Sequence, residues 1–467
     1  MCLFDSSLSW CELKKPIISL DQIDTESTHY NNHPDLDKPL HFQYIPPMSS
    51  KKKPQPRMLF ATPDGEIYDH PDLLLMVRRG EEFGLPRPDE ITPLPPESEF
   101  FMLPGRHAMG YNAETGQAEI MEELAVAAFA CPGHTVTGVS AYESDEDAPI
   151  LPLLSYGAIG YANGKFWVCA KKVDQDKRQV FTHIPQDRVE GGARQLIRDM
   201  PENRLVNHLA GCALTSGCPA AKNLALGRFE CPLPTARTCN ARCVGCISEQ
   251  PEDSGFPSPQ CRISFTPTAE EIVQIMQRHE SRERRPIFSF GQGCEGEPLT
   301  EAELICDAVK AYRADGGTGT VNVNTNASKP AAMPALKIAG VNSIRVSLNS
   351  ARKGPYEAYY RPKGYSFEDV SETIAKAHEV GMHVSLNLLY FPGITDTEEE
   401  FDALVELGEK GHYDFIQLRN LNLDPELYLD LMRPFGHSPS MGFMNFKRRL
   451  KKALPWIEYG YFNPYLG

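Results

Sequence analysis

Residues 231–246 read CPLPTARTCNARCVGC and end in three cysteines within eight residues. Cys239, Cys243 and Cys246 follow the spacing C-x3-C-x2-C, so one tight loop can bring three thiols to a single metal centre. Thiolate ligands favour zinc, copper(I) and iron–sulfur centres. Structural zinc takes four protein ligands, whereas a four-iron cluster held by three cysteines leaves one iron free for another molecule. A zinc knuckle completed by Cys231 is the alternative at this point.

The segment CNARCVGC, residues 239–246, resembles the cluster loop of the radical S-adenosylmethionine (SAM) superfamily. The resemblance implies a [4Fe–4S] cluster on Cys239, Cys243 and Cys246, with SAM bound at the open iron. It also implies reductive cleavage of SAM to a 5′-deoxyadenosyl radical. One position differs: many members carry an aromatic residue near the adenine just before the third cysteine, and this chain has Gly245.

From Leu226 to Asn422, apolar β-rich runs alternate with helical patterns, which predicts βαβ units around a parallel sheet. Six runs fit this series: RFECP, RPIFSFG, TVNVNTN, SIRVSLN, HVSLNLLYF and FIQLRNL. Capping-box and C-terminal glycine signals mark the helices between them, at Thr268, Thr300, Thr397, Gly340, Gly381 and Gly411. The pattern fits a doubly wound sheet or a barrel, and the resemblance implies a partial (βα)6 TIM-like barrel.

Polar residues at the ends of these runs are candidate ligand contacts, because βα barrels bind ligands at the carboxyl ends of their strands. Gly296, Glu297 and Pro298 resemble the Gly-Gly-Glu-Pro motif that holds the SAM ammonium group, with Glu295 where glycine is usual. Later runs resemble those of the molybdenum-cofactor biosynthesis cyclase group, although Ala327 replaces a glycine. The resemblance thus implies a SAM-binding set of Gly296, Glu297, Thr325, Asn326, Ser347 and Asn349, and the end of the fifth run adds Asn387 as a candidate. No catalytic residue is assigned.

The sixth run is unusually polar. Alternation places Gln417 and Arg419 on one face of that strand and Asn420 and Asn422 on the other. An inward Arg419 would suit a carboxylate of SAM or of a substrate. An outward, solvated Arg419 is equally compatible with the pattern.

Three further cysteines, Cys212, Cys218 and Cys231, precede the cluster loop. They could hold an auxiliary cluster, which some radical SAM enzymes contain. No fourth ligand is evident nearby, so we interpret them as buried small hydrophobic residues.

The chain divides into four expected parts. Residues 1–57 form a loosely held arm in which Cys2 and Cys11 are incidental, and residues 58–210 form a β-rich α+β domain with a hairpin at Asn163-Gly164. Residues 211–425 form the radical SAM core. Residues 426–467 form a helix and an aromatic tail, a candidate lid, whose basic segment 447–452 we interpret as a solvated face; binding of an anionic substrate or leader peptide is the alternative.

Composition bounds the location and partners. The 467-residue chain has 13 cysteines, a net charge of −15, and neither a signal-peptide pattern nor an apolar run long enough for a membrane span. We therefore expect a cytoplasmic protein in which thiols serve metals or catalysis. The charge argues against a broad nucleic-acid surface. Expected partners are a small-molecule or peptide substrate and a reductant such as ferredoxin or flavodoxin.

The favoured function is a radical SAM enzyme that abstracts hydrogen from an unidentified substrate. One alternative is a non-catalytic binding protein stabilised by zinc or an iron–sulfur cluster. Another is an activating enzyme for a glycyl-radical partner. No cysteine array follows the predicted barrel, because Cys306 is the last cysteine of the chain, so the commonest peptide-maturase layout is not supported.

Overall fold

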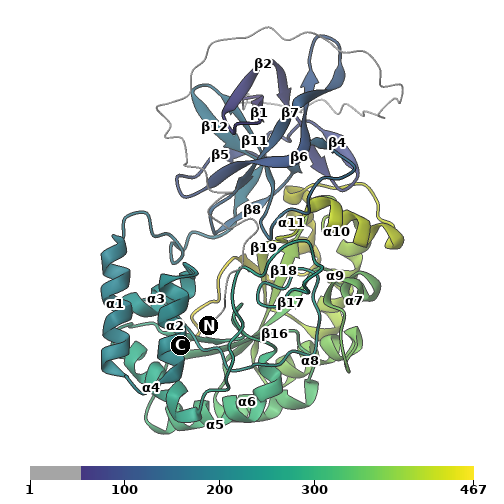
Figure 1. Ribbon diagram of the computed structural model, residues 1–467. Coiled ribbons are helices and arrows are strands. Elements are labelled where there is room, and N and C mark those ends of the chain that lie inside the picture. The colour runs from purple at the N-terminus through teal and green to yellow at the C-terminus, as the bar shows by residue number, and fades with distance from the viewer. Residues whose placement is uncertain (1–53) are drawn as a thin grey trace.

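The computed structural model describes residues 54–467, which form an antiparallel N-terminal sheet and a parallel C-terminal sheet (Figure 1). Most of the expected N-terminal arm, with Cys2 and Cys11, lies outside the described residues. Within them, no helix is both long and apolar enough to cross a membrane.

The N-terminal sheet contains eleven strands in the order β10-β6-β2-β1-β7-β11-β9-β3-β4, with β12 and β5 attached at β11. A further β6–β7 pairing joins two strands of this path, and β8 pairs with β13 separately. The bounds are β1 Arg57–Ala61, β2 Ile67–Leu75, β3 Val77–Arg79, β4 Glu82–Gly84, β5 Thr92–Pro93, β6 Glu99–Asn112, β7 Gln117–Phe129, β8 His134–Val136, β9 Val139–Ser140, β10 Tyr142–Ser144, β11 Gly157–Ala162, β12 Lys165–Val168 and β13 Ala170–Lys172.

The hairpin expected at Asn163-Gly164 is confirmed between β11 and β12. Both turn residues have positive φ, 54° and 72°. Two-residue hairpin turns of this kind match the right-handed twist of their strands, which explains the Asn-Gly pair.

Three helices follow: α1 (Gln186–Asp199), α2 (Arg204–Leu214) and α3 (Pro219–Leu226). They lie beside the parallel sheet, with α3 against β14 and α2 against α4. Asn203 caps α2 by accepting from the Val206 amide (3.1 Å), and its side-chain amide donates to the Glu271 carbonyl (2.9 Å). The expected domain boundary at residue 210 falls inside α2.

The C-terminal sheet has seven parallel strands in chain order and curves into a half-barrel covered by helices (Figure 1). Six strands match the six predicted runs, and the tail supplies the seventh, which pairs with β19. The strands are β14 Glu230–Pro232, β15 Ile287–Phe290, β16 Thr320–Thr325, β17 Ser343–Leu348, β18 His383–Tyr390, β19 Phe415–Asn420 and β20 Glu458–Gly460. The helices are α4 Ala269–Glu280, η1 Pro298–Glu301, α5 Ala302–Ala314, η2 Pro330–Ala332, α6 Met333–Ala339, α7 Lys353–Tyr360, α8 Phe367–Glu379, α9 Glu398–Gly411, α10 Pro425–Met432, η3 Arg433–Phe435 and α11 Phe443–Ala453.

The predicted helix starts agree with the structure in part. Thr268 forms the expected capping box at α4, and Thr397 is the N-cap of α9 without a side-chain cap bond. The start predicted at Thr300 is wrong, because Glu297 caps the short η1 turn that precedes α5. Gly340 ends α6 in the left-handed conformation, as predicted.

The N-terminal domain rests on the carboxyl ends of β18 and β19 (Figure 1). The Thr135 hydroxyl donates to the Leu418 carbonyl (2.7 Å), and Asn420 accepts from the Val136 amide (2.8 Å). A buried ion pair joins Arg106 of β6 to Asp424 before α10 (2.7 Å). The outward position of Asn420 therefore serves the contact between the two domains.

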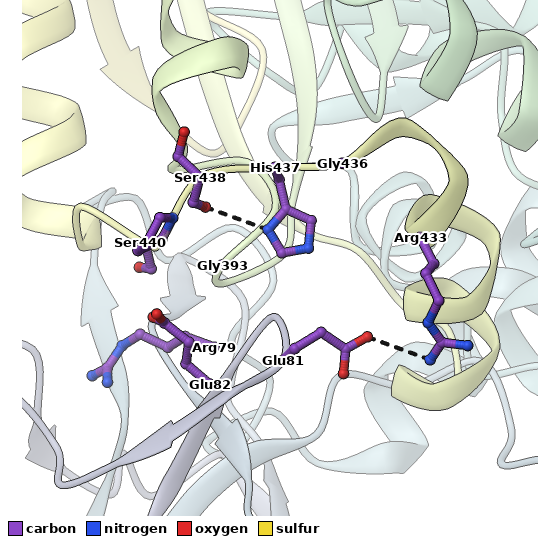
Figure 2. Close-up of a pocket in the computed structure, with 10 residues that line it drawn as sticks. Arg79, Glu81, Glu82, Gly393, Arg433, Gly436, His437, Ser438 and Ser440 are labelled. Atoms are coloured by element: carbon purple, nitrogen blue, oxygen red, sulfur yellow. Dashed lines mark hydrogen bonds and ion pairs between the residues drawn. The ribbon is translucent and has the colours of Figure 1, made fainter. Parts of the chain in front are cut away.

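A pocket of about 540 Å³ lies in this contact (Figure 2). Arg79, Glu81 and Glu82 line it from β3 and β4, opposite Gly393 and the segment 436–440. The pocket contains none of the three loop cysteines or the predicted SAM contacts.

Candidate metal and cofactor site

The cysteine loop directly follows β14 and rests on α7. The Arg242 amide donates to the Tyr360 carbonyl (3.0 Å), and the Val244 amide donates to the Tyr359 carbonyl (2.9 Å). These carbonyls lie at the end of α7, where backbone acceptors lack helical partners. The end of a helix thus fixes the backbone that carries Cys243 and Cys246.

Gly245 is explained by the same contact. A Cβ atom at this position would lie 2.5 Å from the Tyr359 hydroxyl, so no larger residue fits without movement. The Tyr359 ring is buried. An aromatic side chain is therefore present beside the third cysteine, but α7 supplies it rather than the loop.

The segment at Gly296 is joined to the cysteine loop through the backbone. The Gly296 amide donates to the Ala236 carbonyl (2.7 Å), and the Glu297 amide donates to the Thr238 carbonyl (2.9 Å). A Cβ atom at Gly296 would overlap the Thr238 carbonyl. The structure thus brings the two sequence motifs into direct contact and requires glycine at their junction.

Glu295 braces the start of the cysteine loop. Its buried carboxylate accepts from the amides of Thr235 (2.7 Å), Ala236 (2.9 Å) and Gln292 (2.6 Å). Burial raises the pKa of Glu295 to about 7, and the amide donors act in the opposite direction by favouring the carboxylate. The Glu295 carboxylate therefore binds backbone amides of its own loop and of the segment before the three cysteines.

Glu297 ties the same region to the end of β16. Its carboxylate accepts from the amides of Leu299 (3.0 Å) and Asn326 (2.8 Å) and from the Thr325 hydroxyl. The Asn326 side chain donates to Asn240 of the cysteine loop (2.7 Å). Burial raises the pKa of Glu297 to about 7, against these donors.

Ala327 follows with φ of 59°. Glycine suits this turn because it adopts left-handed backbone readily. Ala327 adopts the same left-handed conformation in place of the glycine. Gly296, Glu297, Thr325 and Asn326 consequently form one hydrogen-bonded group with the cysteine loop.

The remaining predicted SAM contacts form no hydrogen bond with this group among the described residues. Ser347 of β17 and Asn387 of β18 are register partners and are partly exposed. Asn349 is fully buried in the loop after β17, where its amide donates to the Pro355 carbonyl (3.2 Å). Its Oδ1 atom has no hydrogen-bond partner among the described residues.

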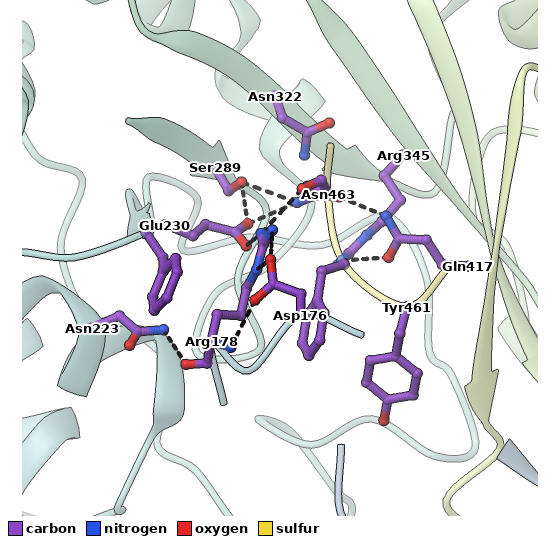
Figure 3. A network of polar contacts seen from close by, with 12 residues as sticks. Asp176, Arg178, Asn223, Glu230, Ser289, Asn322, Arg345, Gln417, Tyr461 and Asn463 are labelled. Atoms are coloured by element: carbon purple, nitrogen blue, oxygen red, sulfur yellow. Dashed lines mark hydrogen bonds and ion pairs between the residues drawn. The ribbon is translucent and has the colours of Figure 1, made fainter. Parts of the chain in front are cut away.

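The interior of the half-barrel holds a polar network around Asn463, a tail residue (Figure 3). The Asn463 amide donates to Glu230 (2.7 Å) and to the Ser289 hydroxyl (3.1 Å), and its Oδ1 accepts from Gln417 (2.8 Å). One side chain therefore links β14 and β15 to β19. The sequence gives no signal for this role, because Asn463 lies beyond the last predicted strand.

Arg345 and Arg419 face this interior from β17 and β19. Arg345 donates to Gln417 Oε1 (3.2 Å), while its Nε atom has no partner among the described residues. Burial, with the nearby charge of Arg419, lowers the pKa of Arg345 to about 10. Arg419 donates to the Tyr461 carbonyl (3.1 Å) and lies over the Tyr461 ring. The inward orientation considered for Arg419 is the one observed, and its neighbour Arg345 was missed.

The positions of Cys231 and of the three loop cysteines argue against a closed zinc site. Cys231 is fully buried within β14 as part of the hydrophobic core. The sulfur atoms of Cys239, Cys243 and Cys246 do not all lie within 4.8 Å of one another. Ligands of one zinc ion must converge more closely, whereas the cysteines of a cluster bind different irons. Burial raises the pKa of Cys243 well above its usual value, and a bound cationic centre would act in the opposite direction by favouring the thiolate.

Comparisons with known proteins indicate which family part of the chain resembles. Residues 233–407 match the family model of the Radical SAM superfamily. Molybdenum cofactor biosynthesis protein 1 of Homo sapiens is 31% identical over 172 residues, which cover 36% of this chain and 25% of that protein. A probable GTP 3′,8-cyclase of Methanocella arvoryzae is 32% identical over 170 residues, 36% of this chain and 49% of that protein.

The chain thus spans between a quarter and half of the length of these two relatives. The solved structure of HydG, a maturase of the [FeFe]-hydrogenase, is similar with a TM-score of 0.36 and 15% identity, covering 59% of this chain and 67% of that one. Members of the matched family bind a [4Fe–4S] cluster and SAM. Residues 233–407 of this chain are therefore similar to the radical SAM superfamily of enzymes.

Proposed function

We propose that this chain cleaves SAM reductively and abstracts hydrogen from a small substrate within a partial (βα)6 barrel. The observation that carries the proposal is the backbone pairing between the cysteine loop and the Gly296 segment. This pairing supports an arrangement in which three candidate cluster ligands lie beside the loop that would receive SAM. When bound, the cluster would supply the electron for SAM cleavage.

The donor set fits a cluster better than a closed zinc site. Three cysteines come from one loop, and the fourth candidate, Cys231, is enclosed in the core. We therefore assign Cys239, Cys243 and Cys246 as the cluster ligands. This assignment supports an enzyme over the zinc-stabilised binding protein considered from the sequence.

The predicted SAM contacts fall into two sets. In one set the polar atoms already form hydrogen bonds within the protein, and in the other they do not. Glu297, Thr325 and Asn326 already bond to one another, so we propose that they hold the SAM loop in position. Ser347 and Asn387 form no side-chain hydrogen bond with another described residue and are free to meet a ligand from the interior face. Gly296 would contribute its backbone, and the unpartnered Oδ1 of Asn349 is a further candidate acceptor.

The two interior guanidinium groups support a substrate with an anionic group. Arg345 lies near the positive charge of Arg419, which the charge of Glu230 offsets in part, and no described carboxylate forms an ion pair with either arginine. A carboxylate or phosphate would relieve this repulsion and satisfy the free Nε atom of Arg345. The relatives named GTP 3′,8-cyclase make nucleotides the first compounds to test. We further propose a ferredoxin or flavodoxin as reductant, a reducing cytoplasmic setting for the free thiols, and the N-terminal domain as a cover over the carboxyl ends of β18 and β19.

Anaerobic reconstitution tests the core of the proposal. The loaded chain should contain about four iron atoms and should form 5′-deoxyadenosine when supplied with dithionite and SAM. The Cys243→Ala variant is the negative control. A correctly loaded cluster that never turns over SAM would contradict the proposal.

The substrate class has a separate test. Nucleotides and dicarboxylates should accelerate 5′-deoxyadenosine formation more than uncharged analogues, and the Arg419→Met variant should lose this preference. Equal rates with charged and uncharged compounds would argue against an anionic substrate while leaving SAM cleavage unaffected.

A further inference from the structure

Outside the cluster loop, His208, Cys212 and Cys294 bring three potential metal ligands together. Their ligand atoms all lie within 4.8 Å of one another, and the Cys212 sulfur is 3.6 Å from His208 Nε2. Ligands of one tetrahedral zinc ion, at about 2.3 Å for sulfur and about 2.0 Å for nitrogen, lie about 3.6 Å apart. The group therefore has the spacing of a mononuclear site rather than that of a cluster.

Helix geometry explains the proximity of two of these three residues. His208 and Cys212 are four residues apart on α2 and so share one face of the helix. The ion pair of Arg204 with Glu271 (2.8 Å) fixes the start of α2 against α4. The His208 ring packs edge-on against Phe265. Both donors are thus held in place by contacts that do not depend on a metal.

Cys294 reaches the group from the loop after β15. Its carbonyl accepts from the Ile263 amide (2.7 Å), and the neighbouring Glu295 carboxylate is bound to the amides of Thr235 and Ala236. The Cys294 side chain is 4% exposed, whereas His208 and Cys212 are partly exposed. Solvent, and hence a metal ion, can reach the group from the α2 side.

Cys218 lies beside these residues without joining them. Its amide donates to the Cys212 carbonyl (3.1 Å), but its sulfur is not part of the 4.8 Å group. The other convergent group of the described residues, His378, His412 and Asp414, lies at the surface, and its two imidazole rings are stacked on each other. The cysteine-containing group is the one with soft donors.

We propose that His208, Cys212 and Cys294 bind one zinc-class divalent cation with an open fourth position. Two thiolates and a neutral imidazole balance the charge of the ion, which suits a partly buried site. Binding would release the two thiol protons to solvent and involve no change of oxidation state. The ion would join α2 to the loop that braces the cysteine loop, and would thereby stabilise the region around the candidate cluster.

Cobalt(II) titration of the full chain tests the site. The three loop cysteines are replaced by alanine (C239A/C243A/C246A) so that they cannot bind cobalt, and circular dichroism checks that the chain is folded. One equivalent of Co²⁺ should then give the visible bands of tetrahedral cobalt and thiolate-to-cobalt charge-transfer bands. Adding Cys212→Ser, Cys294→Ser or His208→Ala should weaken Co²⁺ binding by more than about tenfold. Loss of a residue that only orients a metal ligand already lowers metal affinity by that factor.

Matched controls separate this site from other thiols. Cys218→Ser and Cys306→Ser should leave Co²⁺ affinity unchanged. A folded triple variant without the cobalt spectrum would overturn the proposal, as would a Cys212–Cys294 disulfide in protein purified under reducing conditions. A loss with Cys218→Ser as large as with Cys294→Ser would overturn the open fourth position.

Metal analysis of the cluster-loaded, otherwise unaltered chain gives an independent result. About one zinc per chain should accompany the iron, and Cys294→Ser should remove the zinc while the iron remains. Because zinc is measured apart from SAM turnover, failure of this inference and failure of the proposed function are distinguishable. Absence of zinc from protein grown with added zinc would contradict the inference.

Discussion

The two cysteine groups of this molecule are assembled in different ways. Cys239, Cys243 and Cys246 come from one loop, and their sulfurs do not all lie within 4.8 Å of one another. The second group takes two residues from α2 and one from the loop after β15, and its donors converge. Cysteines that are neighbours in sequence can thus suit a multinuclear cluster, while ligands that are distant in sequence can converge on a single metal ion.

The two groups are also physically connected. Glu295, the residue after Cys294, holds the start of the cysteine loop, and Gly296 pairs with the same loop through the backbone. A substitution in either group should therefore affect metal binding or stability at the other. The following experiments test how far the two groups behave independently.

The largest effect is expected at the cysteine loop. Cys243→Ala should reduce the iron content after reconstitution from about four per chain to background, since it removes one of the three cysteines that would hold the whole cluster. Iron analysis and the visible spectrum measure this. Cys218→Ser is the matched control and should keep its iron; equal loss in both variants would show that the loop is not the cluster site.

The junction between the two motifs should be nearly as sensitive. Gly296→Ala places a Cβ atom onto the Thr238 carbonyl, which is backbone and cannot move aside easily. Overpacking of this kind costs up to about 3 kcal/mol, so urea unfolding should show a loss of that order together with poor cluster retention.

Gly191→Ala provides the control for this change. Gly191 lies within α1, and a Cβ atom there meets nothing within 4 Å. Alanine should therefore stabilise the chain by about 0.5–1 kcal/mol through helix propensity. Similar losses in both variants would mean that the junction carries no special constraint.

Zinc removal should have an intermediate effect on the stability of the chain, and this effect should depend on the ligands of the second group. In the variant without loop cysteines, Zn²⁺ at a hundredfold its Kd should raise the free energy of unfolding by about 2.7 kcal/mol, because it binds the folded chain. A chelator should reverse this gain. Adding Cys294→Ser should abolish it, and a gain that survives that substitution would place the ion elsewhere.

The contrast between local and distant residues also explains which parts of the fold and of the candidate site could be predicted from the sequence. Six strands of the parallel sheet and the cysteine loop follow from local patterns, and the proximity of Glu297 follows from the resemblance. The interpretation of Cys212 as a buried small hydrophobic residue is wrong, because Cys212 is partly exposed and its partners His208 and Cys294 are defined only by the packing of α2 against the sheet. The strand β20 is three residues long and too short for an alternating pattern.

Other parts of the site depend equally on tertiary contacts. Asn463 enters the half-barrel from the tail, and Arg345 was not distinguished from an ordinary strand residue, since register alone turns it inward. The absence of an aromatic residue at Gly245 could be read from the sequence, but its replacement by Tyr359 could not.

The smallest expected effect tests that replacement. Gly245→Ala should destabilise the chain by about 1 kcal/mol, because the new methyl group meets the Tyr359 hydroxyl, the end of a side chain that can yield. In the Tyr359→Phe background the hydroxyl is gone and the cost should fall, giving a coupling of at least about 0.5 kcal/mol in a double-mutant cycle. Urea unfolding of the four proteins measures the cycle. Additive effects would mean that Tyr359 does not occupy the space beside the third cysteine, and the two cysteine groups would then differ less in their dependence on distant residues than the structure indicates.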